Sequence, residues 1–468
     1  MSRDSQELLL GFTQAIALTM SVAFLTYVCL IVVPYLRHRR AAVGDSAAFD
    51  WHFLVPCRDE ESVIGETIEY LRHTFPRAHI WIVDDHSDDA TADVVRTVCQ
   101  RDPFSTIFVH LVTRRRPNAR TGKGDALNAG YRALVGWLST PNRWQAAPHP
   151  DNTIVIVVDA DGRPAPDCFD VCAAGNLFGD PTIGAVQVDV RMINRGIRQP
   201  GVSLARRWLG SALVRMQDLE FRTAIAAIQM FRKFSGTISM GGNGQFTRLS
   251  ALDSIAGDDR NPWRGSLLED FELGVHLLTA GWRTGFTVDT YVDQEGLYSL
   301  RRFLAQRTRW GQGTMQCARY IRQIWESRHV STAGAAEMLY YLAQPWMQLL
   351  GTLIYPIPLV LLTIFAVNNP DGAWLWFSDG AWILFLIYGM FGLSPFLVWG
   401  PIYRHRCERR GSVFRGVGYG FLYALYIYTF YITSWRALFR LIRRRNTWAK
   451  TRRNAERHQP SELVAPET

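Results

Sequence analysis

Acidic residues stand at the ends of three apolar runs in the N-terminal part of the chain. Asp59 follows the first run, Asp84 and Asp85 end the second, and Asp159 and Asp161 follow the third. Two carboxylates at positions i and i+2 can hold a hard divalent cation, and such a cation bridges phosphate oxygens. Any single aspartate of this set could equally serve only in a turn or as a helix cap, where aspartate is common. The recurrence of acids after three separate runs predicts that these carboxylates converge on one site.

A glycine-rich segment supplies a cation where a helix is expected to begin. Thr121 to Gly124 contain Lys123 and follow the basic run Arg114 to Arg116. The amide groups at a helix N-terminus, together with a lysine, suit the charge of a diphosphate. The segment is not a Walker A loop, because the GxxxxGK[ST] spacing is absent. A solvated turn is the simpler alternative for these residues.

Leu268, Glu269 and Asp270 open a second apparently helical stretch. Either acid could act as a helix cap, where the helix dipole favours negative charge. Asp270 could instead act as a general base, since a sugar hydroxyl needs a proton acceptor when it attacks.

The sequence Gln306 to Trp310 places Gln306 and Trp310 four residues apart, on one face of a helix, with Arg309 beside them. An indole stacks on the face of a sugar, and a guanidinium pairs with phosphate. The alternative is an amphipathic helix at a membrane surface, with Trp310 as its interfacial anchor.

Alternating strands and helices are expected to position these side chains. The predicted strands are His52–Val55, Ile80–Val83, Thr106–Val112 and Thr153–Val158, and the predicted helices are Ile64–Phe75, Ala90–Val98 and Asp125–Leu138. This alternation predicts an α/β domain with a largely parallel sheet covered on both faces. Ligands bind beyond the carboxyl ends of the strands in such a sheet, which is where the acids fall.

Long stretches without charged residues flank this domain. They are Leu8–Leu36, Met338–Pro370, Gly380–Tyr403 and Gly416–Trp435. Their length and composition predict membrane helices. We therefore expect an N-terminal anchor at 1–40, a cytosolic catalytic domain at 41–330, a membrane bundle at 331–440 and a basic tail at 441–468. The expected location is the plasma membrane, with several crossings.

The formal net charge of +9 is concentrated in clusters beside these apolar stretches, which suits anionic lipid head groups and not nucleic acid. The predicted spans conflict with the tendency of basic residues to lie on the cytosolic side of a membrane. Three C-terminal crossings would put the basic residues after Trp435 outside. Either one stretch is re-entrant or interfacial, or Met338–Pro370 crosses twice. The seven cysteines form no CxxC pair, which argues against a disulfide framework or a zinc site.

The ordered set of motifs resembles glycosyltransferase family 2, in particular its membrane-embedded branch of cellulose, chitin and hyaluronan synthases. The resemblance runs from His52 to Trp310 and extends to Trp448–Thr451. Its elements are PCRDEE from Pro56, VDDHSDD from Val83, GKGDALN from Gly122, DAD from Asp159, LED from Leu268 and QRTRW from Gln306. The resemblance implies a GT-A-like, Rossmann-like domain.

The same resemblance implies roles for individual residues. The donor would contact Asp59, Asp85, Lys123, Asp159 and Arg309; the acceptor would contact Gln306, Trp310, Gly242 and Asn243; Asp161 would hold Mg²⁺ or Mn²⁺, and Asp270 would be the catalytic base. Two positions depart from the family pattern, since Asp59 replaces the usual asparagine and His86 the usual glycine.

The expected activity is inverting transfer of a sugar from a nucleotide-sugar donor to a growing polysaccharide, with a β linkage in the product. UDP-glucose, UDP-N-acetylglucosamine and GDP-mannose are all compatible donors by the resemblance. One alternative is a non-processive enzyme that makes a glycolipid. Another is a membrane translocation component that lacks catalysis.

Overall fold

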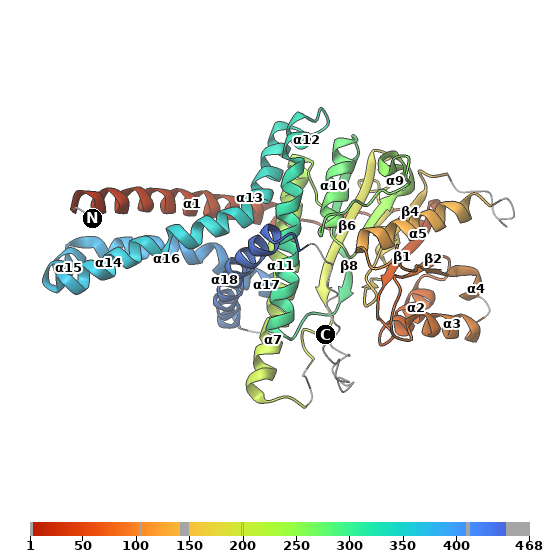
Figure 1. Ribbon diagram of the computed structural model, residues 1–468, viewed down its shortest axis with the longest axis horizontal. Helices are drawn as coiled ribbons and strands as arrows, with labels where there is room; N and C mark the ends of the chain where they lie inside the picture. Colours follow the sequence, from red (N-terminus) through yellow and green to blue (C-terminus); the bar gives the residue numbers. More distant parts are fainter. Residues whose placement is uncertain are drawn as a thin grey trace.

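The computed structural model describes residues 3–102, 105–140, 149–197, 199, 201–408 and 412–445 of the 468-residue chain. Figure 1 shows a mixed α/β domain and an arm of helices that projects from it, with the N-terminus at the far end of the arm. Trp448–Thr451 and most of the predicted tail 441–468 lie outside the described residues.

The α/β domain is built on one eight-stranded sheet with the order β3-β2-β1-β4-β7-β6-β8-β5. The strands are β1 (Asp50–Cys57), β2 (His79–Asp84), β3 (Val109–Thr113), β4 (Thr153–Val157), β5 (Arg163–Pro164), β6 (Ile183–Met192), β7 (Gln245–Arg248) and β8 (Arg283–Gln294). Strands β3, β2, β1 and β4 are parallel, as is the pair β6–β8. Strand β7 is antiparallel to β4 and β6, and β5 is antiparallel to β8. The expected parallel arrangement is confirmed for the first half, but the whole sheet is mixed, because the short and largely polar β7 reverses its direction.

The strand expected at Thr106–Val112 is wrong in its first half. Residues Ser105–Phe108 form a helical turn, α4, and β3 begins only at Val109. The backbone N–H of Ser105 donates to the carbonyl oxygen of Asp102 at 2.9 Å, and its hydroxyl donates to the Asp102 carboxylate at 2.7 Å. These bonds turn the chain into helical geometry and override the β-branched side chains that follow.

Helices cover both faces of the sheet, as Figure 1 shows for α5 on one side and for α2 and α3 on the other. The helices of the domain are α2 (Ile64–Thr74), α3 (Thr91–Arg101), α5 (Lys123–Leu138), α6 (Cys168–Cys172), α7 (Leu204–Leu219), α8 (Ala226–Ser235), α9 (Leu249–Ala256), α10 (Glu269–Thr279), α11 (Leu300–Cys317) and α12 (Ile321–Glu326). Three short turns complete it: η1 (Ser46–Ala48), the π-helical η2 (Glu220–Ile225) and η3 (Ala318–Tyr320). The three helices predicted between the first strands are thereby confirmed.

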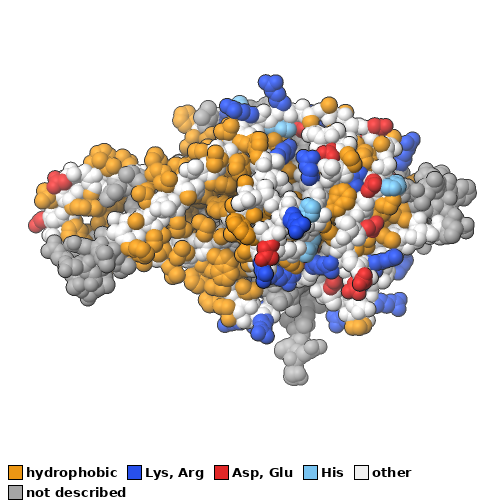
Figure 2. Space-filling view, turned by 90° about the horizontal axis from the view of Figure 1, so that it is seen from above, with side chains coloured by type: hydrophobic (Ala, Val, Ile, Leu, Met, Phe, Trp, Pro, Cys, Tyr) orange, Lys and Arg blue, Asp and Glu red, His pale blue; other side chains and the backbone are white. Residues whose placement is uncertain are grey.

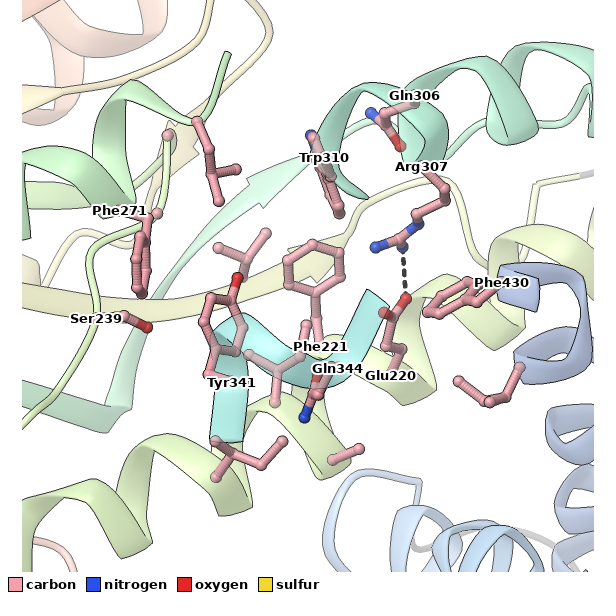
Figure 3. Close-up of a pocket in the computed structure, with 18 of the residues that line it drawn as sticks. Glu220, Phe221, Ser239, Phe271, Gln306, Arg307, Trp310, Tyr341, Gln344 and Phe430 are labelled. Atoms are coloured by element: carbon pink, nitrogen blue, oxygen red, sulfur yellow. Dashed lines mark hydrogen bonds and ion pairs between the residues drawn. The ribbon is translucent and has the colours of Figure 1, made fainter. Parts of the chain in front are cut away.

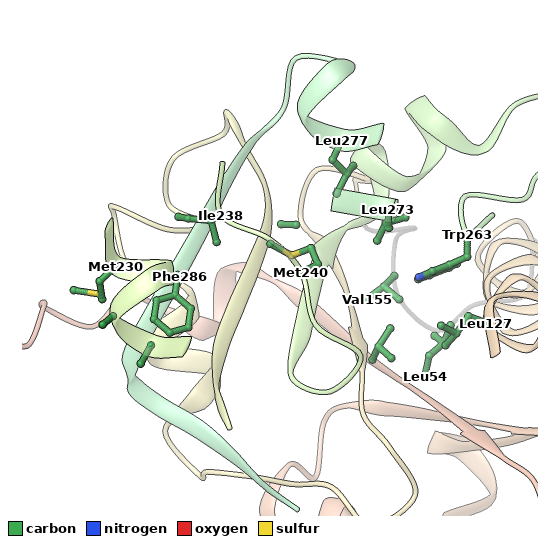
Figure 4. Packing of buried hydrophobic residues seen from close by; sticks show 14 of the residues in the cluster. Leu54, Leu127, Val155, Met230, Ile238, Met240, Trp263, Leu273, Leu277 and Phe286 are labelled. Carbon is green, nitrogen blue, oxygen red and sulfur yellow. The ribbon is translucent and has the colours of Figure 1, made fainter. Parts of the chain in front are cut away.

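The core follows the two-residue alternation of the strands. Phe53 and Val55 of β1 are fully buried in the cluster that contains Ile64 and Ile68 of α2. Leu54, between them, belongs to the opposite cluster, which Figure 4 shows with Leu127 of α5, Val155 of β4 and Trp263 around it. Because successive side chains of a strand point to opposite faces, the two clusters fix the sheet from both sides and hold its carboxyl ends in place.

The arm consists of α1, α14, α15 and α16. The helices outside the domain are α1 (Arg3–Arg37), α13 (Thr332–Ile354), α14 (Pro356–Asn368), α15 (Pro370–Trp376), the π-helical η4 (Phe377–Ala381), α16 (Trp382–Leu397), α17 (Trp399–Arg406) and α18 (Val413–Ile442). In Figure 1, α14 runs outward beside α1, α15 lies at the tip, and α16 returns. Hydrophobic side chains cover most of the arm surface in Figure 2. Within the described residues, two helical segments are long and apolar enough to cross a membrane, Gln14–Arg37 and Thr332–Asn368.

The arrangement of the arm bears on the alternatives for its orientation. The stretch Met338–Pro370 runs outward once, through α13 and α14, and does not fold back within itself. Helix α18 packs at the base of the arm against α11, α13 and α17 and against α16, and does not run along α14. The described part of the chain therefore contains a helical hairpin plus α1 that project, and one long helix that stays at the base. The predicted membrane bundle remains a prediction.

Candidate active site

One cavity of about 1030 Å³ joins the carboxyl ends of β1, β2 and β4 to the helices of the arm. The charged side chains that line it include Asp85, Lys123, Asp159, Asp161, Asp270 and Arg309. The predicted convergence of acids from distant stretches is thus found in the structure. Gln306, Trp310, Gly242 and Asn243 line the same cavity.

Asp85 lies directly after β2 and is held from two sides. Its carboxylate accepts a hydrogen bond from the guanidinium of Arg114 and a second, at 3.0 Å, from the backbone N–H of Arg120. The side chain is buried, with the residue 3% exposed. Such charge-assisted bonds fix a carboxylate in one orientation, so Asp85 presents a defined edge to the cavity.

His86 and Asp59 both adopt left-handed backbone angles. His86 has φ 59°, and its carbonyl oxygen accepts hydrogen bonds from Arg120 Nε at 2.9 Å and Nη2 at 2.6 Å. This angle explains why glycine is the usual residue at this position of the motif, since only glycine adopts it without strain. Asp59 has φ 53°, and its Oδ1 accepts the N–H of Asp88 at 2.7 Å. The Asp59 side chain is absent from the cavity lining, so its expected donor contact stays a prediction.

Lys123 is the first residue of α5 and joins two motifs. Its Nζ lies 2.7 Å from Asp159 Oδ1 and donates to the carbonyl oxygen of Gly242, also at 2.7 Å. Burial by itself lowers the pKa of Lys123, but Asp159 and Glu269 outweigh it and the net pKa is raised. Lys123 is therefore a cation at neutral pH, and the solvated turn considered from the sequence is excluded.

The pair Asp159 and Asp161 follows β4 and supplies hard oxygen donors. Asp161 is 8% exposed, and its Oδ2 accepts the N–H of Glu295 at 3.0 Å. Within the described residues no group of three histidine, cysteine or acidic side chains could surround a metal ion. This donor set fits Mg²⁺ or Mn²⁺ bound by one or two carboxylates, with the remaining ligands from phosphate oxygens and water.

Glu269 and Asp270 begin α10 and face the cavity together. Leu268, and not Asp270, occupies the N-cap position, while Asp270 Oδ1 accepts the N–H of Phe271 at 2.7 Å. Burial, reinforced by Asp270, raises the pKa of Glu269 to about 7. Burial also raises the pKa of Asp270, and Lys123 limits the rise. A buried carboxylate with a raised pKa is suited to accept a proton, as a general base must.

The loop before β7 brings backbone close to both motifs. A Cβ added at Gly242 would lie 3.0 Å from Lys123 Nζ and 3.2 Å from a carboxylate oxygen of Asp270. The Oδ1 of Asn243 accepts the N–H of Asp159 at 3.3 Å, and its Nδ2 donates to Gln294 at 2.9 Å. Gly242 therefore leaves space between Asp270 and Lys123, and Asn243 ties the loop to the acid pair.

Helix α11 presents Gln306, Arg309 and Trp310 to the cavity. Burial lowers the pKa of Arg309, and Glu269, Asp159 and Asp270 counteract this. The guanidinium is thus drawn toward the acids, where it can pair with the phosphates of a ligand.

Among the charged residues of the cavity that were not predicted is an ion pair. Arg307 of α11 and Glu220 of η2 form a buried ion pair, shown in Figure 3, with 2.5 Å between Nη2 and Oε2. They are separated by 87 positions in the chain, and no sequence motif surrounds Glu220. Only the tertiary structure reveals this pair.

Comparisons with known proteins agree with this geometry. The model of the family described as glycosyltransferase like family 2 matches residues 50–313, which is more than half of the 468 residues. A mannosyltransferase from Pyrobaculum calidifontis, solved in complex with GDP-Man and Mn²⁺, superposes on 90% of this chain and 98% of its own, with a TM-score of 0.51 and 16% identity. This likeness concerns the fold and confirms the expected GT-A-like domain.

Two relatives carry the name β-monoglucosyldiacylglycerol synthase. The protein from Synechocystis sp. is 28% identical over 272 residues, which cover 57% of this chain and 48% of that protein. The protein from Nostoc sp. is 27% identical over 338 residues, which cover 70% of this chain and 61% of that protein. The chain thus spans about half to three fifths of the length of these relatives. The expected polysaccharide-synthase branch finds no support in these two names.

Proposed function

This chain belongs to glycosyltransferase-like family 2, and from that premise we propose that it transfers a hexose from a nucleotide-sugar donor to a hydroxyl group of a membrane glycerolipid. The observation that carries the proposal is the single cavity of about 1030 Å³ that extends from the carboxylates to the apolar helices of the arm. The names of the relatives from Synechocystis and Nostoc are consistent with a glycerolipid acceptor and a β linkage.

The far end of the cavity suits acyl chains. It is lined by Phe24, Ile31, Pro356, Phe391, Phe396 and Phe430, which come from α1, α14, α16 and α18. Apolar walls with a few polar groups at one end are typical of a site for an amphipathic ligand. A lipid with its chains among these side chains would bring its head group toward Asp270.

The charges along the cavity favour a neutral head group over a lipid phosphate. Arg232 lies 2.7 Å from a carboxylate oxygen of Glu337, and Arg307 lies 2.5 Å from one of Glu220, with all four side chains buried. The positive charge of both arginines is balanced within the protein, so a phosphate between them would lose its hydration without compensation. A hydroxyl acceptor also accounts for the buried Asp270, because a phosphate oxygen needs no base.

The proposed reaction is a single displacement with inversion. Asp270 accepts the proton of the acceptor hydroxyl, and the oxygen bonds to the anomeric carbon while the bond from that carbon to the diphosphate breaks. Lys123 and Arg309 offset the charge of the departing nucleoside diphosphate. An α-linked donor then gives a β-linked glycolipid.

The remaining assignments follow the same geometry. Donor contacts are proposed for Asp59, Asp85 and Asp159, and acceptor contacts for Gln306, Trp310, Gly242 and Asn243. Asp161, with Asp159 beside it, would hold Mg²⁺ or Mn²⁺, which when bound offsets diphosphate charge.

We further propose that α1, the α13–α14 run and α16 cross the membrane, with α15 on the far side and α18 along the near surface. This arrangement puts the basic residues after Leu36 and those at the end of α18 on the side of the catalytic domain, which removes the conflict in orientation. The proposed parts are the anchor 1–40, the cytosolic domain 41–330 and the membrane part 331–440, followed by the tail 441–468.

Product analysis with purified protein in lipid nanodiscs tests the proposal. UDP-glucose, UDP-N-acetylglucosamine and GDP-mannose are each offered with Mg²⁺ or Mn²⁺ and diacylglycerol, and the organic extract is analysed by mass spectrometry. We expect a diacylglycerol that carries a hexose, and its loss in Asp270→Asn, which still binds nucleotide. A large water-soluble polymer instead would support polysaccharide synthesis, and no nucleotide release with any donor would support the non-catalytic alternative.

A further inference from the structure

Arg307 lies on α11 between Gln306 and Arg309, for which ligand contacts are proposed. No ligand contact is proposed for Arg307 itself, because its guanidinium is bound to other residues of the protein. Its Nη2 lies 2.5 Å from Glu220 Oε2 and donates to the hydroxyl of Tyr426 at 2.9 Å. The Tyr426 hydroxyl donates to the same Glu220 oxygen at 2.5 Å. The three groups form a closed set of hydrogen bonds that links α11, η2 and α18.

The guanidinium of Arg307 also covers one side of the Trp310 indole. Its central carbon lies 4.2 Å from the ring centroid, within the range of a cation–π interaction. Phe221 meets the same indole edge-on, with 6.2 Å between centroids and an angle of 85°. Figure 3 shows Trp310 next to Phe221 and Arg307 in the cavity. The indole is therefore held in one orientation, and it remains partly exposed in the cavity.

Stability alone does not account for this pair. A buried ion pair contributes little net free energy of folding compared with apolar residues of the same size, because both charges lose their hydration. Glu220 moreover begins a π-helical turn that lines the cavity with Phe221, Ala224 and Ile225, and such turns are frequent at functional sites.

We propose that Glu220, acting through Arg307, is a positioning residue that fixes the Trp310 indole as the surface on which the acceptor head group rests. The proposal rests on the proposed function, because it assigns the indole to the acceptor. The Glu220 carboxylate sets the place of the guanidinium, the guanidinium sets the plane of the indole, and the indole sets the approach of the hydroxyl to Asp270.

The test replaces the pair by neutral side chains of similar size. The double variant Glu220→Gln/Arg307→Met leaves no unpaired buried charge and is expected to keep the thermal midpoint of the wild type. We expect the KM for diacylglycerol in mixed micelles to rise about tenfold, which is the loss of one cation–π contact, while the KM for the nucleotide sugar is retained. Trp310→Ala is expected to show a similar rise, and adding it to the double variant should give no further one.

A second variant keeps the test decisive if the double variant does not fold. Tyr426→Phe retains both charges and removes the two hydrogen bonds of the hydroxyl, to Arg307 and to Glu220, so the acceptor KM should rise about threefold. The control Arg215→Met/Glu408→Gln removes another ion pair, of 2.5 Å, that joins α7 to the segment after α17 outside the cavity lining, and should leave the acceptor KM unchanged.

The outcomes separate the two proposals. An unchanged acceptor KM in the folded double variant, or in Tyr426→Phe if the double variant does not fold, overturns the positioning role and leaves lipid glycosylation intact. Absence of lipid product from the wild type counts against the proposed function, and the positioning role is then judged from the KM of the hydroxyl acceptor that the wild type uses.

Discussion

The ammonium group of Lys123 lies 2.7 Å from the carboxylate of Asp159, so that a cation at the start of α5 faces an acid at the end of β4. The same group donates to the carbonyl oxygen of Gly242 at 2.7 Å. One side chain thus connects the glycine-rich segment, the acid pair and the loop before β7. A bound diphosphate would compete with Asp159 for this cation.

Replacing Lys123 by methionine is expected to weaken donor binding. The variant keeps the length of the side chain and removes one charge-assisted hydrogen bond, so the KM for the nucleotide sugar should rise about 10- to 100-fold. Initial rates at varied donor concentration measure this change. Arg132→Met on the same helix removes an exposed cation outside the cavity lining and serves as control. An equal effect of both variants would show that general electrostatics, and not the position of Lys123, is responsible.

The pH dependence of transfer should report the acids at the start of α10. Burial raises the pKa of Asp270 from its ordinary 3.8, and the pKa of Glu269 to about 7. A base acts only when deprotonated, so activity should be full at high pH and fall as the pH drops through the raised pKa of Asp270. Because Glu269 and Asp270 interact, the fall of kcat at low pH reports the titration of the two acids together.

Glu269→Gln separates the two acids. Removal of a neighbouring negative charge should lower the pKa of Asp270, so the acidic limb should move to lower pH in this variant. A limb that stays in place would mean that Asp270 is not the titrating group.

The sequence predicted the sheet end of the cavity because its signals are local. Strands β1, β2 and β4 are each a short apolar run followed by an acid, and the carboxyl ends of parallel strands meet at one edge. Asp85 and Asp159 therefore fell where they were expected. Asp59 did not reach the cavity, because its left-handed backbone turns the carboxylate toward the N–H of Asp88. No apolar pattern encodes such a turn.

The rest of the site depends on partners that are distant in the chain. Arg307 stands within a recognisable motif, but its partner Glu220 lies in a π-helical turn whose sequence resembles that of any buried helix. The mixed half of the sheet was equally hidden, since β7 has only four residues and no apolar alternation. Hydrophobic patterns give the type of an element and its buried face, whereas tertiary packing decides which elements meet.

A stack of aromatic rings on strands β1, β2 and β3 should make the stability of the fold depend on pH. His110 Nε2 lies 3.1 Å from His79 Nδ1, and its ring stacks on Trp81 with 4.0 Å between centroids. Burial, with His52 nearby, lowers the pKa of His110 from 6.5 to about 4. The unfolded chain binds a proton at this histidine below pH 6.5 while the folded chain does not until about 4, so stability should fall as the pH drops from 6.5 to about 4.

The variant His110→Phe removes this titration and keeps a ring on Trp81. Its thermal midpoint should depend less on pH between 4 and 6.5 than that of the wild type. The difference between the two proteins corresponds to at most about 3 kcal/mol. Parallel curves would show that other groups account for the acid sensitivity.

Two glycines of α16 allow a direct test of the path for acyl chains. A Cβ added at Gly392 or at Gly389 meets no atom within 4 Å, so both positions accept a larger side chain without a clash at this atom. Only Gly392 lines the cavity. A tryptophan there would occupy space that the proposed function gives to the lipid, whereas Gly389→Trp places the same side chain on the same helix outside the cavity lining.

Gly392→Trp is therefore expected to lower transfer to diacylglycerol about tenfold or more. Extra atoms in a space that another group must fill cost about 1–3 kcal/mol, which corresponds to such a loss. Hydrolysis of the nucleotide sugar by water should continue, since Asp85, Lys123 and Asp270 lie at the other end of the cavity. Gly389→Trp should match the wild type in both assays. Measured side by side in nanodiscs, lipid transfer and nucleotide release distinguish a blocked acceptor path from a damaged catalytic centre. Normal lipid transfer by Gly392→Trp would mean that the acceptor reaches Asp270 by another route, because the tryptophan would then fill a space that no substrate uses.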